Sequence, residues 1–176
     1  MKKIKLFIAM SLDGYIADDD GGVNWLMGQG KEDENVDSYA EFIKEIDTII
    51  MGWNTYHQIL TELSPDVWPY DDCITYVVTH KRQEPSKRIQ FVNEDLSDLV
   101  NRLKKEKGKD IWICGGANLV QQLIDQDLID LYYITVIPTI LGSGIRLFEN
   151  GKKEIKLRLV KTQTYNGMVD LVYTKR

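Results

Sequence analysis

The stretch "IWICGGANLVQQLI", residues 111–124, says most about the fold, because it predicts a strand that passes directly into a helix. An apolar run ends at Gly115 and Gly116, and apolar residues then recur at helical spacing. Two successive glycines remove both side chains at the junction. A tight turn would explain the loss, and so would a ligand that must touch the backbone.

Composition predicts one folded domain over residues 1–176. The chain has 176 residues, of which 43% are hydrophobic, and this length and apolar content suit a single domain with a real core. Its net charge is −5 and the basic residues are dispersed, so we expect a small-molecule substrate and no nucleic acid partner.

The cysteines, the lack of metal-ligand spacing and the N-terminus narrow the class of protein further. Cys73 and Cys114 both lie in apolar runs and are expected to be buried free thiols. The chain shows no metal-ligand spacing, so no metal site is predicted. The first apolar run, "LFIAM", is too short for a signal-peptide core or a membrane span. A cytoplasmic protein without a membrane partner is therefore expected.

Strands and helices alternate in the first two thirds of the chain. Apolar and β-branched runs predict strands at 4–10, 47–52, 73–79, 110–114 and 128–138. Helical spacing predicts helices at 36–43, 53–60, 93–108 and after the double glycine, with Asn93 capping the third and Asn54 or Thr55 the second. This order is typical of a mostly parallel sheet with helices on both faces.

The C-terminal third changes character. Residues 155–163 and 168–175 alternate in polarity and are joined through Asn166-Gly167, a strong signal for a two-residue hairpin. We therefore expect an α/β protein in which antiparallel strands extend the sheet at one side.

Three strand ends carry residues suited to phosphate. In an open α/β sheet, ligands bind beyond the carboxyl ends of the strands, where the following helices present free N–H groups. The three ends are Gly115-Gly116, then Gly52 with Asn54 and Thr55, and finally Thr79, His80, Lys81 and Arg82. Each has a simpler reading as a turn, a helix cap or a solvated basic loop. Together they favour a dinucleotide with an extra phosphate, NADP rather than NAD.

The loop after the first strand and the following helix hold the candidate acids. Asp37 and Asp13 could each supply a proton to a reacting substrate. Asp37 could equally be an exposed charge on a helix, and Asp13 a turn residue before Gly14. Ile16 in the same loop could lie against a flat ring or pack on the core.

The ordered set of motifs resembles a known family. "AMSLDGYIA", "IIMGWNTYHQI", "YVVTHK", "IWICGGANLVQQLI" and "LIDLYYITVIPTILGSGIRLF" together resemble the dihydrofolate-reductase-like superfamily, and within it the RibD C-terminal group. That group contains the riboflavin-pathway reductase domain and its stand-alone relatives. The resemblance covers essentially the whole chain. It implies a three-layer fold around a central mixed, mostly parallel sheet of about eight strands.

The resemblance also implies a cofactor and its contacts. NADPH would be the hydride donor, and the protein would be a homodimer. Ala9 and Ile16 would border the nicotinamide, and Thr79, His80 and Lys81 would lie by the 2′-phosphate. The diphosphate and adenosine side would be held by Gly52, Trp53, Asn54, Thr55, Gly115, Gly116, Ala117, Asn118 and Leu119.

The expected function is an NADPH-dependent oxidoreductase acting on a pterin-like or aminopyrimidine-like heterocycle or a carbonyl compound. The resemblance points to dihydrofolate reductase and to the 5-amino-6-(5-phosphoribosylamino)uracil reductase of riboflavin biosynthesis. Three departures matter: Trp53 stands where an arginine is common, Cys114 stands where riboflavin reductases have glutamate, and "LTELSPD" lacks their Asp-Asp-Pro. These departures leave open an alternative, a non-catalytic NADP(H)-binding sensor or assembly protein.

Overall fold

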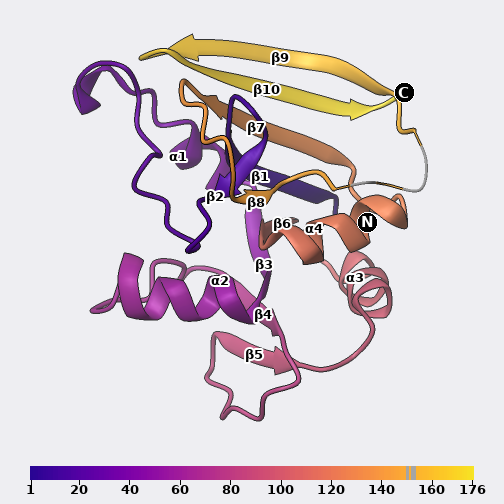
Figure 1. Cartoon of the computed structure of the whole chain (residues 1–176). Coiled ribbons are helices and arrows are strands. Elements are labelled where there is room, and N and C mark those ends of the chain that lie inside the picture. Colours follow the sequence, from indigo (N-terminus) through magenta and orange to yellow (C-terminus); the bar gives the residue numbers. More distant parts are fainter. Residues whose placement is uncertain (150, 152–153) are drawn as a thin grey trace.

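Eight strands form one mixed sheet in this computed structural model, which describes residues 1–149, 151 and 154–176. Their order is β5-β4-β3-β6-β1-β7-β10-β9. All neighbours pair in parallel except β10, which is antiparallel to β7 and β9 (Figure 1). The strands are β1 (Ile4–Ser11), β3 (Ile46–Gly52), β4 (Ile74–Val78), β5 (Ile89–Val92), β6 (Asp110–Gly115), β7 (Leu131–Ile137), β9 (Leu157–Tyr165) and β10 (Met168–Lys175). A short second sheet pairs β2 (Tyr15–Ala17) with β8 (Ile145–Arg146).

Helices cover both faces of the sheet, as the alternating sequence predicts (Figure 1). The helices are η1 (Glu32–Glu34), α1 (Ser38–Ile43), α2 (Trp53–Gln58), η2 (Ile59–Leu63), α3 (Leu96–Lys104) and α4 (Ala117–Asp125). Leu99 of α3 and Leu123 of α4 belong to the core on one face, and Phe42 of α1 belongs to the core on the other. In β3, Ile49 and Ile50 enter opposite cores, because successive strand side chains point to opposite faces.

The C-terminal hairpin forms as predicted. Asn166 and Gly167 join β9 to β10 with φ angles of 47° and 74°. Two successive positive φ angles are what a two-residue turn needs to match the twist of its strands.

Two predicted helix starts are wrong, and a third helix begins where predicted but with a different cap. The first helix begins at Ser38, so Val36 precedes it and is exposed. The third begins at Leu96 and is capped by Asp95, whose side chain accepts from Ser97 N and Asp98 N, rather than by Asn93. In α2 the N-cap is Gly52, with no side-chain cap. Several neighbouring polar residues can cap equally well, and tertiary packing selects which one does.

The strand β5 is absent from the elements that the sequence pattern predicts. Its four residues, "IQFV", are all half-buried and carry too short an alternating pattern to stand out from a loop. It becomes a strand because its backbone pairs with β4 from Thr75 to Val78.

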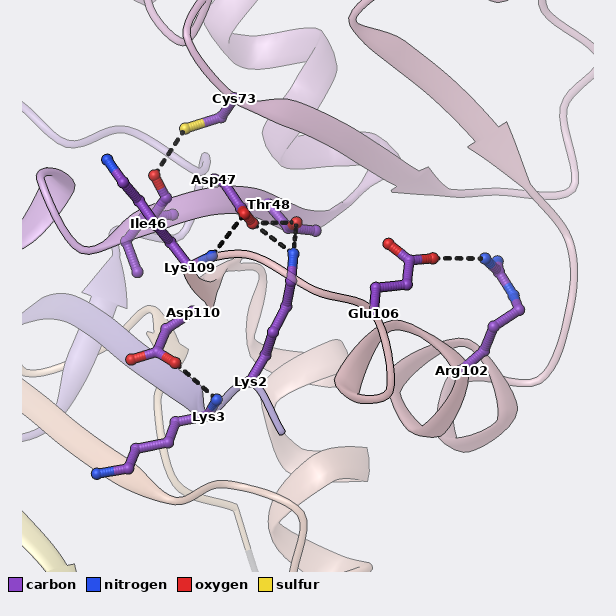
Figure 2. A network of polar contacts seen from close by, with 10 residues as sticks. All are labelled: Lys2, Lys3, Ile46, Asp47, Thr48, Cys73, Arg102, Glu106, Lys109 and Asp110. Atoms are coloured by element: carbon purple, nitrogen blue, oxygen red, sulfur yellow. Dashed lines mark hydrogen bonds and ion pairs between the residues drawn. The ribbon is translucent and has the colours of Figure 1, made fainter.

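A polar network ties together the amino ends of the central strands (Figure 2). The buried Lys2 donates from Nζ to Asp47 Oδ1 at 2.5 Å and to Thr48 Oγ1 at 3.0 Å. Burial opposes ionisation of Asp47, but hydrogen bonds from Lys2, Thr48 and the Lys109 N–H outweigh it and lower its pKa. This network anchors β1 to β3 at the edge opposite the carboxyl ends, where the candidate site lies.

Candidate functional site

A cleft of about 1050 Å³ opens at the carboxyl ends of β1, β3, β4 and β6. Thirteen of the fourteen predicted cofactor residues line it, although they come from distant parts of the chain. They are Ala9, Ile16, Gly52, Trp53, Asn54, Thr55, Thr79, His80, Gly115, Gly116, Ala117, Asn118 and Leu119. The fourteenth, Lys81, is next to His80 and packs against Trp53. The structure therefore brings the predicted cofactor residues together along one rim.

The two glycines at the end of β6 differ in whether the turn requires a glycine at that position. Gly115 has a φ of +131°, a conformation that side chains rarely adopt, so the turn itself requires glycine there. Gly116 has an ordinary φ of −84°. Among the described residues, a Cβ on Gly116 would meet only Thr55 Oγ1, at 3.6 Å, which is ordinary contact. Neither its φ angle nor the atoms around it explain why Gly116 lacks a side chain.

Gly52 repeats this pattern across the cleft. Its φ is −81°, and a Cβ there would meet only Gly116 N, at 3.8 Å, within the described part of the chain. Gly52 and Gly116 are the N-caps of α2 and α4, and neither makes a side-chain cap hydrogen bond. The first N–H groups of a helix lack intrahelical partners and lie in its positive field. The two glycines thus leave a bare backbone path that suits an anion.

The carboxyl end of β4 adds cationic groups to this rim. Thr79 is buried and its Oγ1 accepts from Lys81 N at 3.1 Å. Lys81 Nζ lies 4.4 Å from the centre of the Trp53 ring, a cation–π distance. The exposed His80 lines the cleft beside them. Lys81 thus lies over the ring of Trp53, the residue that stands where the family resemblance leads us to expect an arginine.

Asp13 does not lie with the cofactor residues. Its carboxylate accepts from Ser11 Oγ at 2.6 Å, from Gly142 N at 2.8 Å and from Leu141 N at 3.1 Å. The Ser11 hydroxyl and these backbone N–H groups lower the pKa of Asp13 to about 2. Asp13 therefore holds the 141–142 loop as an ionised carboxylate, and its role as a proton donor stays a prediction.

Asp37 also lies outside the residues that line the cleft. It is exposed, and its Oδ1 accepts from Ala40 N at 2.9 Å, so it is the N-cap of α1. The structure thus places the predicted acid at a helix cap, and its catalytic role stays a prediction.

Two further groups near this region are not among the predicted site residues. Cys114 lines the cleft, and burial raises the pKa of its thiol to about 12, so the thiol stays protonated. The second group is Asp170, which is 1% exposed on β10. A signal for it is present in the sequence, because Asp170 sits at the inward position between Met168 and Val172 in an alternating strand.

Comparisons with known proteins agree with this fold. The model of the RibD C-terminal domain matches residues 2–171. The protein YwjB of Bacillus subtilis (strain 168) is 42% identical over 175 residues, which span 99% of this chain and 98% of YwjB.

Two solved structures are similar over nearly their whole length. A protein of Shewanella sp. PV-4, to which a role in riboflavin biosynthesis is ascribed, has a TM-score of 0.85 at 27% identity, with 99% of both chains covered. Dihydrofolate reductase from Enterococcus faecalis, solved as a complex with NADP(H), has a TM-score of 0.66 at 17% identity, covering 99% of this chain and 96% of that one. This chain therefore has a dihydrofolate-reductase-like fold, and it belongs to the RibD C-terminal domain family.

Proposed function

We propose that this protein is an NADPH-dependent reductase that transfers a hydride to a small pterin-like or aminopyrimidine-like heterocycle or to a carbonyl compound. The observation that carries the proposal is the bare backbone face of Gly52 and Gly116, where neither the φ angles nor the neighbouring atoms exclude a side chain. It lies in the cleft that the cofactor residues line, and the chain shares its fold with a reductase solved with NADP(H).

The residues present fit this cofactor. The amino ends of α2 and α4, at Gly52 and Gly116, would hold the diphosphate, because their N–H groups face an anion without a Cβ in the way. Lys81 and His80, at the end of β4, would hold the 2′-phosphate that distinguishes NADPH from NADH. Ala9 lines the same cleft from β1 and would border the nicotinamide.

When bound, NADPH supplies the hydride, and the chain supplies position and shelter. Gly52 and Gly116 would orient the cofactor from one side, and Ala9 and Ile16 would border its nicotinamide end in the same cleft. The protonated Cys114 thiol adds a neutral, water-poor wall to the cleft. Neither Asp13 nor Asp37 lines the cleft, so proton delivery by a solvent molecule is the simplest expectation.

A fluorescence titration with NADPH and NADH tests the proposal. The native chain should bind NADPH at least about tenfold more tightly than NADH, since one charge-assisted phosphate contact contributes roughly 1.5–3 kcal/mol. Lys81→Ala should lose most of this preference, whereas Lys87→Ala, an exposed lysine of the same loop, should keep it. Equal binding of both cofactors, or no binding, would contradict the proposal.

A non-catalytic NADP(H)-binding protein is the second candidate. Both predicted acids lie outside the cleft lining, and Cys114 stands where riboflavin reductases carry a glutamate. Tight NADPH binding without oxidation in the presence of dihydropterins, aminopyrimidines or aldehydes would favour this role. Steady NADPH oxidation with one of them would favour the reductase.

The remaining expectations are a cytoplasmic homodimer and a place in riboflavin biosynthesis. The dihydrofolate-reductase-like fold and the family leave both open. None of the described helices has the length and apolar character needed to cross a membrane. Sedimentation of the purified chain would test the homodimer, and growth of a deletion strain without riboflavin would test the pathway.

A further inference from the structure

The tip of the β9–β10 hairpin is bonded to a loop that lies far away in the sequence. Asn166 Oδ1 accepts from Gly30 N at 2.5 Å. Asn166 Nδ2 donates to Lys31 O at 3.0 Å and to Asn35 Oδ1 at 2.7 Å. The backbone carbonyl of Asn166 accepts from Gln29 N at 2.9 Å. We name these four hydrogen bonds the Asn166 latch.

The hairpin tip and the loop also fit closely against each other. A Cβ on Gly28 would overlap Cγ of Asn166 and would lie 2.6 Å from its carbonyl oxygen, closer than Cβ atoms approach in proteins. Docking against Asn166 therefore requires a glycine at position 28. On the other side of the contact, a Cβ on Gly167 would lie 2.7 Å from Gln29 Oε1.

Little else holds the 28–35 segment in place. Residues 29–35 are exposed, and none of the ion pairs among the described residues includes a residue of this segment. Its other hydrogen bonds to described residues lie within the segment itself. A segment with few buried contacts opens locally at a lower free energy than the core. We therefore expect the segment to leave the hairpin far more often than the fold unfolds.

The hairpin tip carries a chemical reactivity of its own. In an Asn-Gly pair, the backbone nitrogen of the glycine can attack Cγ of the asparagine, because no glycine side chain shields that nitrogen. The new N–Cγ bond closes a succinimide ring, and the Cγ–Nδ2 bond breaks, so that ammonia leaves with the proton of the attacking N–H. Water then opens the ring and gives aspartate or isoaspartate. Asn166-Gly167 is such a pair, and water is the co-reactant.

The closed latch opposes this reaction. Attack requires Cγ of Asn166 to turn toward the Gly167 nitrogen, and it requires Nδ2 to leave. The hydrogen bond to Oδ1 and the two hydrogen bonds from Nδ2 hold the amide in another orientation. The reactive orientation thus becomes accessible when the 28–35 segment has moved away.

The product cannot form the latch again. The carboxylate of an aspartate has no proton to donate, so it would face two acceptors, Lys31 O and Asn35 Oδ1, without a hydrogen bond to either. An isoaspartate lengthens the backbone of the two-residue turn by one methylene and changes its geometry. Release of the 28–35 segment is then permanent.

We propose that Asn166 is a deamidation site controlled by the 28–35 segment. Its amide is protected while the segment is docked and is hydrolysed when the segment leaves, after which the segment stays released. The segment leads from Leu26, which lines the cleft, to the start of α1. The inference depends neither on the cofactor nor on the proposed reductase function.

Mass spectrometry of the full chain, incubated in mildly alkaline buffer with and without urea, tests the site. Tryptic peptide 162–175 contains Asn166, and peptide 147–152 contains the other Asn-Gly pair, so a gain of about 1 Da can be assigned to one of them. The native chain should react at Asn166 at least about tenfold more slowly than the chain in urea, because the reaction waits for local opening.

A loop variant tests the protection without altering the hairpin. Asn35→Ala removes one acceptor of Nδ2 and should accelerate deamidation of Asn166 about threefold or more in the native state. Asn24→Ala is the matched control, because Asn24 is an exposed asparagine of the same loop and lies outside the Asn166 latch. It should react at the rate of the native chain.

Hydrogen exchange measures the release of the segment. The deamidated chain and Asn166→Asp should exchange the backbone amides of residues 28–35 about threefold or more faster than the native chain, because the latch is broken. Asn166→Gly should do the same without adding a charge, and glycine accepts the positive φ of this position. In both variants β9 and β10 should stay protected.

The outcomes decide each part of the inference. Equal deamidation rates in the native and urea-unfolded chains, or in the native chain and Asn35→Ala, would overturn the control by the segment. If Asn166 stayed intact in both folded chains while the unfolded chain reacted, it would not be a site in the folded protein. Unchanged exchange of residues 28–35 in the deamidated chain and in Asn166→Asp would overturn the latch.

Discussion

Among single residues, the glycines show how an absent side chain can indicate function. Gly115 is required by its positive φ, whereas Gly116 has an ordinary φ and a Cβ there would make only an ordinary contact, with Thr55. Substitution of Gly116 therefore tests the cleft itself, whereas substitution of Gly115 would also strain the turn.

Gly116→Ala and Gly116→Val should weaken NADPH binding in order of side-chain size. The valine variant should raise the NADPH dissociation constant about tenfold or more, because its methyl groups would occupy the backbone path of the diphosphate. The melting temperature should stay close to that of the native chain, since the φ of Gly116 suits any residue. Titration and thermal unfolding of the same samples check both expectations, and a lower melting temperature with unchanged affinity would assign Gly116 to the turn.

The lowered pKa of Asp13 leads to a prediction about the stability of the fold at low pH. Its pKa is lowered to about 2 by the Ser11 hydroxyl and the 141–142 backbone, so its stabilising effect is present above the ordinary value of 3.8 and is lost as pH falls toward 2. Asp13→Asn should therefore lower the urea midpoint at pH 7, and the difference from the native chain should narrow below pH 3.8. A difference that stays constant down to about pH 2.5 would show that the charge of Asp13 is not what holds the loop.

Among the elements, the two ends of the strands have separate roles. The carboxyl ends of β1, β3, β4 and β6 form the cleft, and the amino ends of β1 and β3 are fastened by the network around Lys2 and Asp47 (Figure 2). Because these edges lie at opposite ends of the strands, a change at one should affect stability without affecting binding at the other.

Lys2→Ala tests this separation. It removes the partner of Asp47 and should cost about 1–2 kcal/mol of unfolding free energy, discounted because the Asp47 side chain is 31% exposed. Lys3→Ala is the matched control, since among the described residues Lys3 joins the network through its backbone N–H to Asp110 and not through its side chain. Urea unfolding should separate the two variants, while NADPH affinity should be the same in both. Reduced NADPH affinity in Lys2→Ala would show that the two edges are coupled.

Across the whole molecule, the sheet order brings together residues that are far apart in the chain. β1 lies between β6 and β7, so Ala9 is placed near Gly116 on one side and Thr135 on the other. One cleft thus connects four strand ends and the amino ends of two helices. A ligand that spans it should stabilise the entire fold, because unfolding must release it.

NADPH should therefore raise the melting temperature of the native chain. At a concentration about one hundred times its dissociation constant, the stabilisation is about 2.7 kcal/mol, which corresponds to roughly 5–10 °C for a chain of this size. Differential scanning fluorimetry measures the shift, and NADH at the same concentration should give a clearly smaller one. Equal shifts would remove the proposed role of the 2′-phosphate contacts.

The alternating architecture, the hairpin at Asn166-Gly167 and the meeting of three glycine-rich or cationic strand ends at one edge of the sheet follow from the amino-acid sequence alone. These features have local signals: apolar runs with a period, glycines at strand ends and a turn dipeptide. The carboxyl ends of parallel strands meet at one edge of a sheet, so local signals are enough to predict that Gly52, His80 and Gly116 lie together.

The strand β5, the helix caps, the placement of Asp13 and Asp37, and the Asn166 latch depend on tertiary contacts. β5 exists through its pairing with β4, and packing selects each cap among several polar neighbours. The latch joins Asn166 to the 28–35 segment, which no local pattern connects to the hairpin. The sheet brings these two segments together, and the chain alone does not reveal such contacts because they depend on strand order and register.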